Sequence, residues 1–112
     1  MSTAVAWLEA RCADVPAGLA DRVREALSEA TRDRRSADGT ALSQVLLDAA
    51  VTCMKAALDQ GPRREAAAHL LAADALLTWA SEAAAEEGGG SLDALAGEAS
   101  RRLAAQSSDA QR

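Results

Sequence analysis

The sequence predicts an all-α protein, a compact antiparallel helical bundle of four main helices plus a short N-terminal helix. Alanine and leucine, the strongest helix formers, dominate the composition, and the chain contains no Ile, Phe, Tyr or Asn. Apolar residues recur at spacings of three and four, which is the period of a helix with one buried face. Breaks at Val15-Pro16, Gly61-Pro62 and Gly88-Gly89-Gly90 separate the periodic stretches.

At 112 residues the chain suits one domain, which we place at residues 1–105, followed by a frayed polar tail at residues 106–112. A chain of this size buries roughly two-thirds of its unfolded surface, so a core forms without metals or disulfides. The richness in Ala, Arg, Asp and Glu is typical of a GC-rich bacterial genome and by itself indicates no function.

Proline separates the first two helices. We expect a first helix over residues 2–13, with Leu8 and Cys12 on one face. Pro16 disfavours the helical conformation at Val15 and suits the first turn of the second helix. The second helix has an inner side of small and medium apolar residues: Leu19, Ala20, Val23, Ala26, Leu27 and Ala30. Residues 31–39 have no apolar period and are expected to form an exposed, mobile loop.

The third helix is expected to be the central one. Gly39 or Thr40 caps it, and it runs to Gln60. Its polar residues fall on one narrow stripe, formed by Gln44, Asp48, Thr52, Lys55 and Asp59. A helix with so thin a polar stripe is surrounded by other helices on most sides.

The Gly61-Pro62 pair predicts a tight corner after the third helix. Glycine suits the left-handed residue that ends a helix, and proline suits the first turn of the next one. So short a link turns the fourth helix, over residues 62–87, back antiparallel to the third. The fourth helix has a broad apolar side formed by Ala66, His69, Ala72, Ala73, Leu76, Leu77, Trp79, Ala80, Ala83 and Ala84.

The triple glycine is expected to end the fourth helix and to act as a flexible joint. Ser91 is a good N-cap for a fifth helix, and Asp93 suits its positive end. The apolar stripe of this helix consists of Leu92, Leu95, Ala96, Ala99 and Leu103.

Charge and targeting signals narrow the class of protein. The net charge of −5 disfavours nucleic acid as a partner, because neutralising phosphates requires a basic face. The N-terminus lacks the basic start of a signal peptide, and no stretch approaches about eighteen uncharged apolar residues. We therefore expect a cytoplasmic protein without membrane insertion, in which Cys12 and Cys53 are reduced and buried.

His69 is the only histidine, and it lies in the middle of the apolar side of the fourth helix. Glu65 stands one turn before it, at a spacing that allows a hydrogen bond and hence an acid–base pair. A metal site requires three or four ligands, and no further ligand shares this face. We expect no catalytic residue, metal or cofactor, and a histidine that is satisfied by packing.

Arginines cluster where the chain turns. In an up-down bundle the start of the fourth helix and the end of the fifth lie at the same end of the molecule. An anion-binding patch is therefore a candidate there, formed by Arg63, Arg64, Arg101 and Arg102. Glu65 and Glu98 offer ordinary ion pairing to the same arginines, which is the simpler interpretation.

The third and fourth helices carry more apolar surface than three weakly apolar helices cover, and surplus apolar surface usually meets a partner. The sequence therefore predicts a non-enzymatic interaction module with a protein partner, either a homodimer or the small subunit of a larger assembly. The candidate interface residues are Trp79, Leu76 and His69, although Trp79 equally suits an alanine-rich core that needs one large side chain. The alternative is a binder of a small apolar or anionic ligand between helices.

Overall fold

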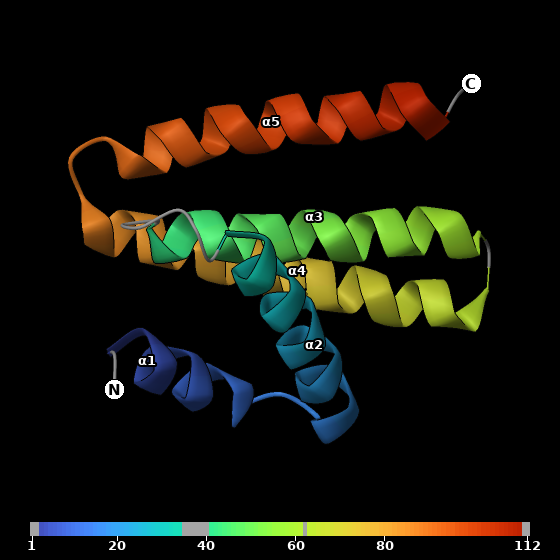
Figure 1. The fold of residues 1–112 in the computed structure, drawn as a ribbon, viewed down its shortest axis with the longest axis horizontal. Coiled ribbons are helices and arrows are strands. Elements are labelled where there is room, and N and C mark those ends of the chain that lie inside the picture. Colours follow the sequence, from blue (N-terminus) through green and yellow to red (C-terminus); the bar gives the residue numbers. More distant parts are fainter. Residues whose placement is uncertain (1–2, 35–40, 62, 111–112) are drawn as a thin grey trace.

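The structure, a computed structural model, describes residues 3–34, 41–61 and 63–110, which form five helices and no strand (Figure 1). The helices are α1 (Thr3–Cys12), α2 (Ala17–Arg34), α3 (Leu42–Gln60), α4 (Arg64–Glu87) and α5 (Ser91–Ala110). The predicted all-α bundle with a short N-terminal helix is therefore confirmed.

An antiparallel hairpin of α3 and α4 forms the centre of the fold (Figure 1). Gly61 ends α3 with a left-handed φ of 67°, and its N–H donates to the carbonyl of Leu58 at 3.3 Å. Arg63, with a φ of −104° and a ψ of 162°, is the extended residue before α4. The chain thus reverses over a few residues, as the Gly61-Pro62 pair predicts, although Pro62 itself lies outside the described residues.

The other three helices cover this hairpin from two sides (Figure 1). After the triple glycine, α5 folds back and runs alongside α3 in the same direction, while α2 crosses the hairpin steeply. On the side of α2, α1 lies beside the C-terminal half of α4. Trp7 Nε1 donates to Glu86 at 3.2 Å, and Arg11 pairs with Glu82 at 2.9 Å. The Arg11 guanidinium also stacks on the Trp7 ring, 3.4 Å from its centroid.

The core consists of a few branched side chains set among alanines. The largest fully buried side chains are Val23, Leu46, Leu47, Leu76 and Leu95, which come from four different helices. Alanines on the facing sides of α3 and α4 let the two helix backbones approach closely, so this pair has the most extensive packing in the fold. Truncating one of these leucines to alanine would cost about 2–5 kcal/mol of stability.

Two helix starts differ from the expected positions. α3 begins at Leu42 with Ala41 as its N-cap residue, and Ala41 has no side chain that caps the helix. The expected caps, Gly39 and Thr40, lie outside the described residues. α4 begins at Arg64 rather than at residue 62, because the chain first passes through the extended conformation at residue 63.

Two helix ends extend further than expected. α2 continues to Arg34, because residues 31–34 include no proline or glycine that would end it. Residues 35–39 of the expected loop lie outside the described residues. α5 continues to Ala110, beyond the domain boundary expected at residue 105. Gln106 is buried and donates to the carbonyl of Val51 at 3.3 Å, which anchors this part of α5 on α3.

Across the described residues, no helix combines the length and the apolar character that crossing a bilayer requires.

Candidate functional site

A pocket of about 250 Å³ opens where α2 crosses the α3–α4 hairpin. Three helices line it: Arg22, Glu25, Ala26 and Glu29 come from α2, Thr52, Cys53 and Ala56 from α3, and His69 from α4. Polar groups set around an apolar floor are typical of small-molecule sites. The pocket contains the only histidine of the chain, His69, and one of its two cysteines, Cys53.

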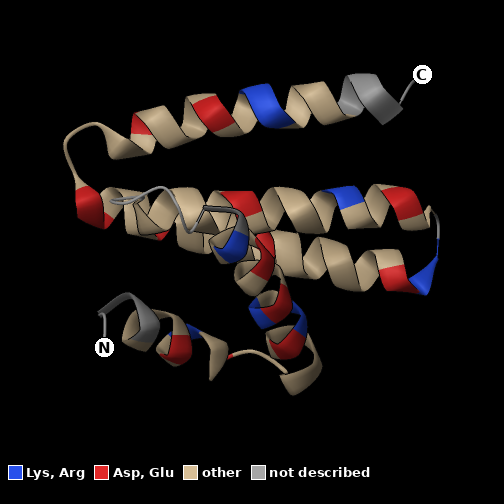
Figure 2. Ribbon diagram, in the orientation of Figure 1, with Lys and Arg blue, Asp and Glu red and all other residues tan. Residues whose placement is uncertain are grey.

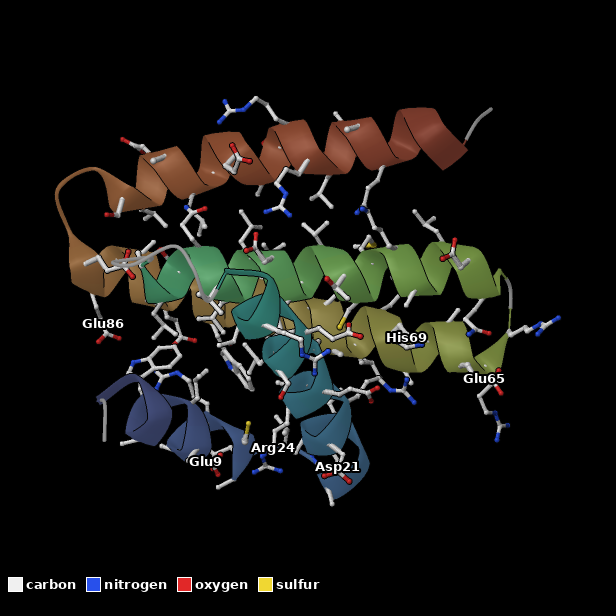
Figure 3. All side chains as sticks on the ribbon, viewed as in Figure 1. Glu9, Asp21, Arg24, Glu65, His69 and Glu86 are labelled. Carbon is white, nitrogen blue, oxygen red and sulfur yellow. The ribbon has the colours of Figure 1, made fainter. Side chains whose placement is uncertain are left out.

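His69 contacts α2 and not Glu65. Nη1 of Arg22 lies 3.3 Å from both ring nitrogens of His69, so it does not point along the lone pair of one nitrogen. Glu65 is exposed one turn nearer the Gly61 corner, and the contacts of the described residues include no hydrogen bond or ion pair between it and His69 (Figure 3). The pair that the sequence spacing allows is therefore not formed.

Cys53 forms part of the pocket floor and is only 3 % exposed. Burial above all raises the pKa of its thiol to about 11; Arg22 opposes this effect, and Glu29 and Glu25 add to it. A thiol that stays protonated is a poor nucleophile, so packing explains this residue. Burial also raises the pKa of Cys12. Both cysteines are free and buried, as predicted.

The remaining polar groups of the pocket are acceptors. The hydroxyl of Thr52 donates to the carbonyl of Asp48 at 3.0 Å, so its oxygen is left to accept. Glu25 and Glu29 are exposed on neighbouring turns of α2. The described part of the chain includes no group of three or more His, Cys, Asp or Glu side chains arranged to hold a metal ion. The pocket therefore presents one guanidinium and two carboxylates above an apolar floor.

The candidate interface residues other than His69 lie inside the molecule. Leu76 is fully buried, and Trp79 is 8 % exposed within the hydrophobic core. In the single chain, Trp79 is therefore a large side chain that fills the alanine-rich core, which is the second of the two interpretations drawn from the sequence. His69 is half-buried under α2.

The four arginines proposed as an anion patch are not gathered together. Arg63 and Arg64 lie at the Gly61 corner, whereas Arg101 and Arg102 lie midway along α5 on the other side of α3 (Figure 2). Arg102 pairs with Asp48 at 2.6 Å, and Arg101 pairs with Glu98 of its own helix at 2.9 Å. The start of α4 and the end of α5 do share one end of the bundle, but the α5 arginines are more than two turns from that end.

The exposed large apolar residues lie at other positions: Leu58, Leu70, Leu71 and Leu92. Leu58 and Leu70 belong to the two hairpin helices near the Gly61 corner, and they are not among the interface residues predicted from the sequence. The available signal was their spacing, because each continues an apolar stripe of its helix at the interval of seven residues.

Comparison of the chain with known protein families, with curated proteins and with solved structures finds no match.

Proposed function

We propose that this chain is a non-enzymatic, cytoplasmic interaction module that forms a homodimer through a corner patch, which consists of Leu58 and Leu70. The proposal is based on one observation. Two apolar stripes of the hairpin are buried by neighbouring helices over part of their length and become exposed to solvent near the Gly61 corner.

The stripe on α3 contains Leu47, Val51 and Leu58. Leu47 is 1 % exposed and Val51 is buried beside Gln106 of α5, but Leu58, seven residues further on, is 49 % exposed. The stripe that is buried under α5 therefore continues as an exposed apolar surface toward the corner.

The stripe on α4 contains Ala84, Leu77 and Leu70. Ala84 is buried, Leu77 is half-buried and Leu70 is 47 % exposed. A helix turns by about 100° per residue, so this stripe lies on the flank opposite Glu82, which α1 contacts. α5 packs on α4 as well as on α3, and it lies on the side of the hairpin opposite α1 (Figure 1). Both stripes thus lose cover on the same side and at the same end.

The charges beside the patch favour a second copy as the partner. Lys55 and Asp59 border Leu58 one turn apart, both exposed, and the described residues show no ion pair for either. In a two-fold dimer, residue i of one copy meets residue j of the other and the reverse. Packing Leu58 against its counterpart would therefore bring Lys55 of each copy to Asp59 of the other.

The dimer is expected to be weak. A specific interface buries at least about 1,000 Å², and two leucines per copy supply only part of that area. Exposed ion pairs add about 0.2–1 kcal/mol each. The dimer should therefore form at high protein concentration and dissociate on dilution.

Sedimentation velocity over a dilution series tests the proposal. Leu58→Glu should abolish the dimer while the helical circular dichroism signal is kept. Leu71→Glu is the matched control, because Leu71 is 59 % exposed and lies on the α1 side of α4. Lys55→Glu should weaken the dimer, and the added change Asp59→Lys should restore it. A monomer at every concentration would reject the homodimer, and equal effects of the two leucine variants would reject the corner patch.

A second candidate, the binding of a small ligand between helices, is supported by the pocket between α2 and the hairpin.

A further inference from the structure

Arg22 carries a half-buried positive charge that has no carboxylate partner among the described residues. Its only side-chain hydrogen-bond partner there is the ring of His69. A guanidinium has five N–H donors, and a neutral imidazole offers one lone pair to accept them. Most of the donors of Arg22 therefore lack an acceptor among the described residues, and a half-buried charge gains most from a partner that replaces the lost water.

Glu25 and Glu29 line the same pocket one and two turns further along α2. Neither carboxylate forms an ion pair with another described residue, and neither bonds to Arg22. All three charges act on the pocket floor, because they alter the pKa of the Cys53 thiol that burial raises. The α2 wall thus presents a cation, with two anions about 5 and 10 Å further along the helix.

The floor beneath these charges is apolar. Ala26 comes from α2, and Cys53 and Ala56 from α3, with the thiol neutral. A volume of about 250 Å³ is smaller than the range of drug-sized sites. The occupant is therefore a small molecule with a short apolar part.

The signs of the charges select among such molecules. A simple anion would be attracted by Arg22 but repelled by Glu25 and Glu29. A simple cation would be attracted by the two carboxylates but repelled by Arg22. A molecule that carries an ammonium and a carboxylate on one carbon satisfies all three residues. An ammonium group has three donors and can bridge two carboxylates, while a carboxylate is the preferred partner of a guanidinium.

We propose that this pocket binds a small zwitterion, a free amino acid with a short apolar side chain. Its carboxylate accepts from Arg22, its ammonium donates to Glu25 and Glu29, and its side chain rests on Ala26, Cys53 and Ala56. The proposal is independent of dimer formation, because the pocket lies on the α2 side of the hairpin and the corner patch on the α5 side.

The ring of His69 is a direct reporter of this site. His69 is the only histidine of the chain, so its imidazole signals in a proton–carbon correlation spectrum need no assignment by mutation. Titration of the protein with valine should shift these signals to saturation with a single dissociation constant. Valinamide keeps only the ammonium and N-acetylvaline keeps only the carboxylate, and each should bind about tenfold more weakly or worse.

Variants assign the two charges. Arg22→Gln should weaken the binding of valine about tenfold and leave the binding of valinamide little changed. The double variant Glu25→Gln, Glu29→Gln should also weaken the binding of valine about tenfold, but it should leave the binding of N-acetylvaline little changed. Arg32→Gln is the matched control, since Arg32 is exposed on the same helix outside the pocket lining. Because Arg22→Gln changes the surroundings of the His69 ring, titration calorimetry should measure the same dissociation constants independently of the ring signals.

The result that overturns the proposal is the absence of a saturable shift at tens of millimolar valine from a protein that is folded by circular dichroism. Equal affinities for valine and valinamide would overturn the role of Arg22 and with it the zwitterion. If Arg32→Gln weakened the binding of valine as much as Arg22→Gln does, the affinity would depend only on the overall charge of α2 and not on the position of Arg22 in the pocket.

Discussion

Ser43 and Glu87 bind each other through two hydrogen bonds. The hydroxyl of Ser43 donates to Oε1 of Glu87 at 2.7 Å, and its backbone N–H donates to Oε2 at 3.1 Å. Ser43 lies in the first turn of α3, where backbone N–H groups have no partner within the helix, and Glu87 is the last residue of α4. The carboxylate therefore caps α3 from the neighbouring helix, in place of the side chain that Ala41 lacks. It also closes the hairpin at the end opposite the Gly61 corner.

This relationship predicts that Ser43 and Glu87 act together. Ser43→Ala and Glu87→Ala should each lower the free energy of unfolding by about 1 kcal/mol, the usual value of an N-cap. The double variant should lose less than the sum, with a coupling of at least about 0.5 kcal/mol by urea denaturation. Asp74→Ala, which removes an exposed carboxylate in the middle of α4, is the control and should have little effect. Additive losses would show that the two hydrogen bonds contribute nothing as a pair.

Cys53 should make the fold sensitive to alkali. Burial raises its pKa from 9.0 to about 11, so the folded state disfavours the thiolate. Stability is unaffected by this group while the thiol is neutral in both states, and it falls as the pH rises from 9 toward 11. By about pH 10.5 the contribution amounts to about 2 kcal/mol. Cys53→Val should reduce the loss between about pH 8 and pH 10.5, measured by urea denaturation. An unchanged loss would mean that the thiol does not titrate as its burial requires.

Gln106 should be replaceable with a gain in stability. Its Nε2 donates to the carbonyl of Val51, but its Oε1 is buried without a hydrogen-bond partner among the described residues. Gln106→Leu removes this unsatisfied oxygen and retains most of the volume, so the free energy of unfolding should rise by about 1 kcal/mol. The melting temperature should rise by about 4 °C or more. Gln60→Leu is the control at a half-buried position. A lower melting temperature for Gln106→Leu would contradict the assignment.

Trp79 should behave as a core residue. Trp79→Ala leaves a cavity among buried alanines and is expected to cost about 3–5 kcal/mol, a large fraction of the stability of a domain of this size. Thermal unfolding followed by circular dichroism measures this loss. Trp7→Ala, at a half-buried position between α1 and α4, should cost less. A Trp79→Ala protein that melts like the wild type but no longer dimerises would return this residue to the interface.

Local signals in the sequence account for most of the helices. The ends of α3 and α4 were predictable because Gly61 and the glycine at residue 88 provide the left-handed residues that end them. The buried sides of α2 and α4 follow from spacing alone. Contacts between helices that are distant in the sequence were not predictable. Arg22 and His69 are 47 residues apart, and their contact depends on the angle at which α2 crosses the hairpin.

Residue type also misleads where a polar group is covered. Asp48 belongs to the narrow polar stripe expected on α3, but in the fold it pairs with Arg102, and its side chain is only 16 % exposed. Gln106 was expected in a frayed tail because it begins a polar run. Helical periodicity predicts on which face of a helix a polar residue lies, but the packing of the neighbouring helix determines whether its side chain is exposed to solvent.

The Gly61 corner also determines the order in which the chain can fold. Closing so short a loop loses little chain entropy, so the α3–α4 hairpin is expected to form first and rapidly. During synthesis the N-terminal helices leave the ribosome before the hairpin on which they pack. α1 is the extreme case, because Glu82 and Glu86, which bind Arg11 and Trp7, are more than 70 residues further along the chain. α1 is made before the other described helices and is therefore expected to be among the last of them to dock.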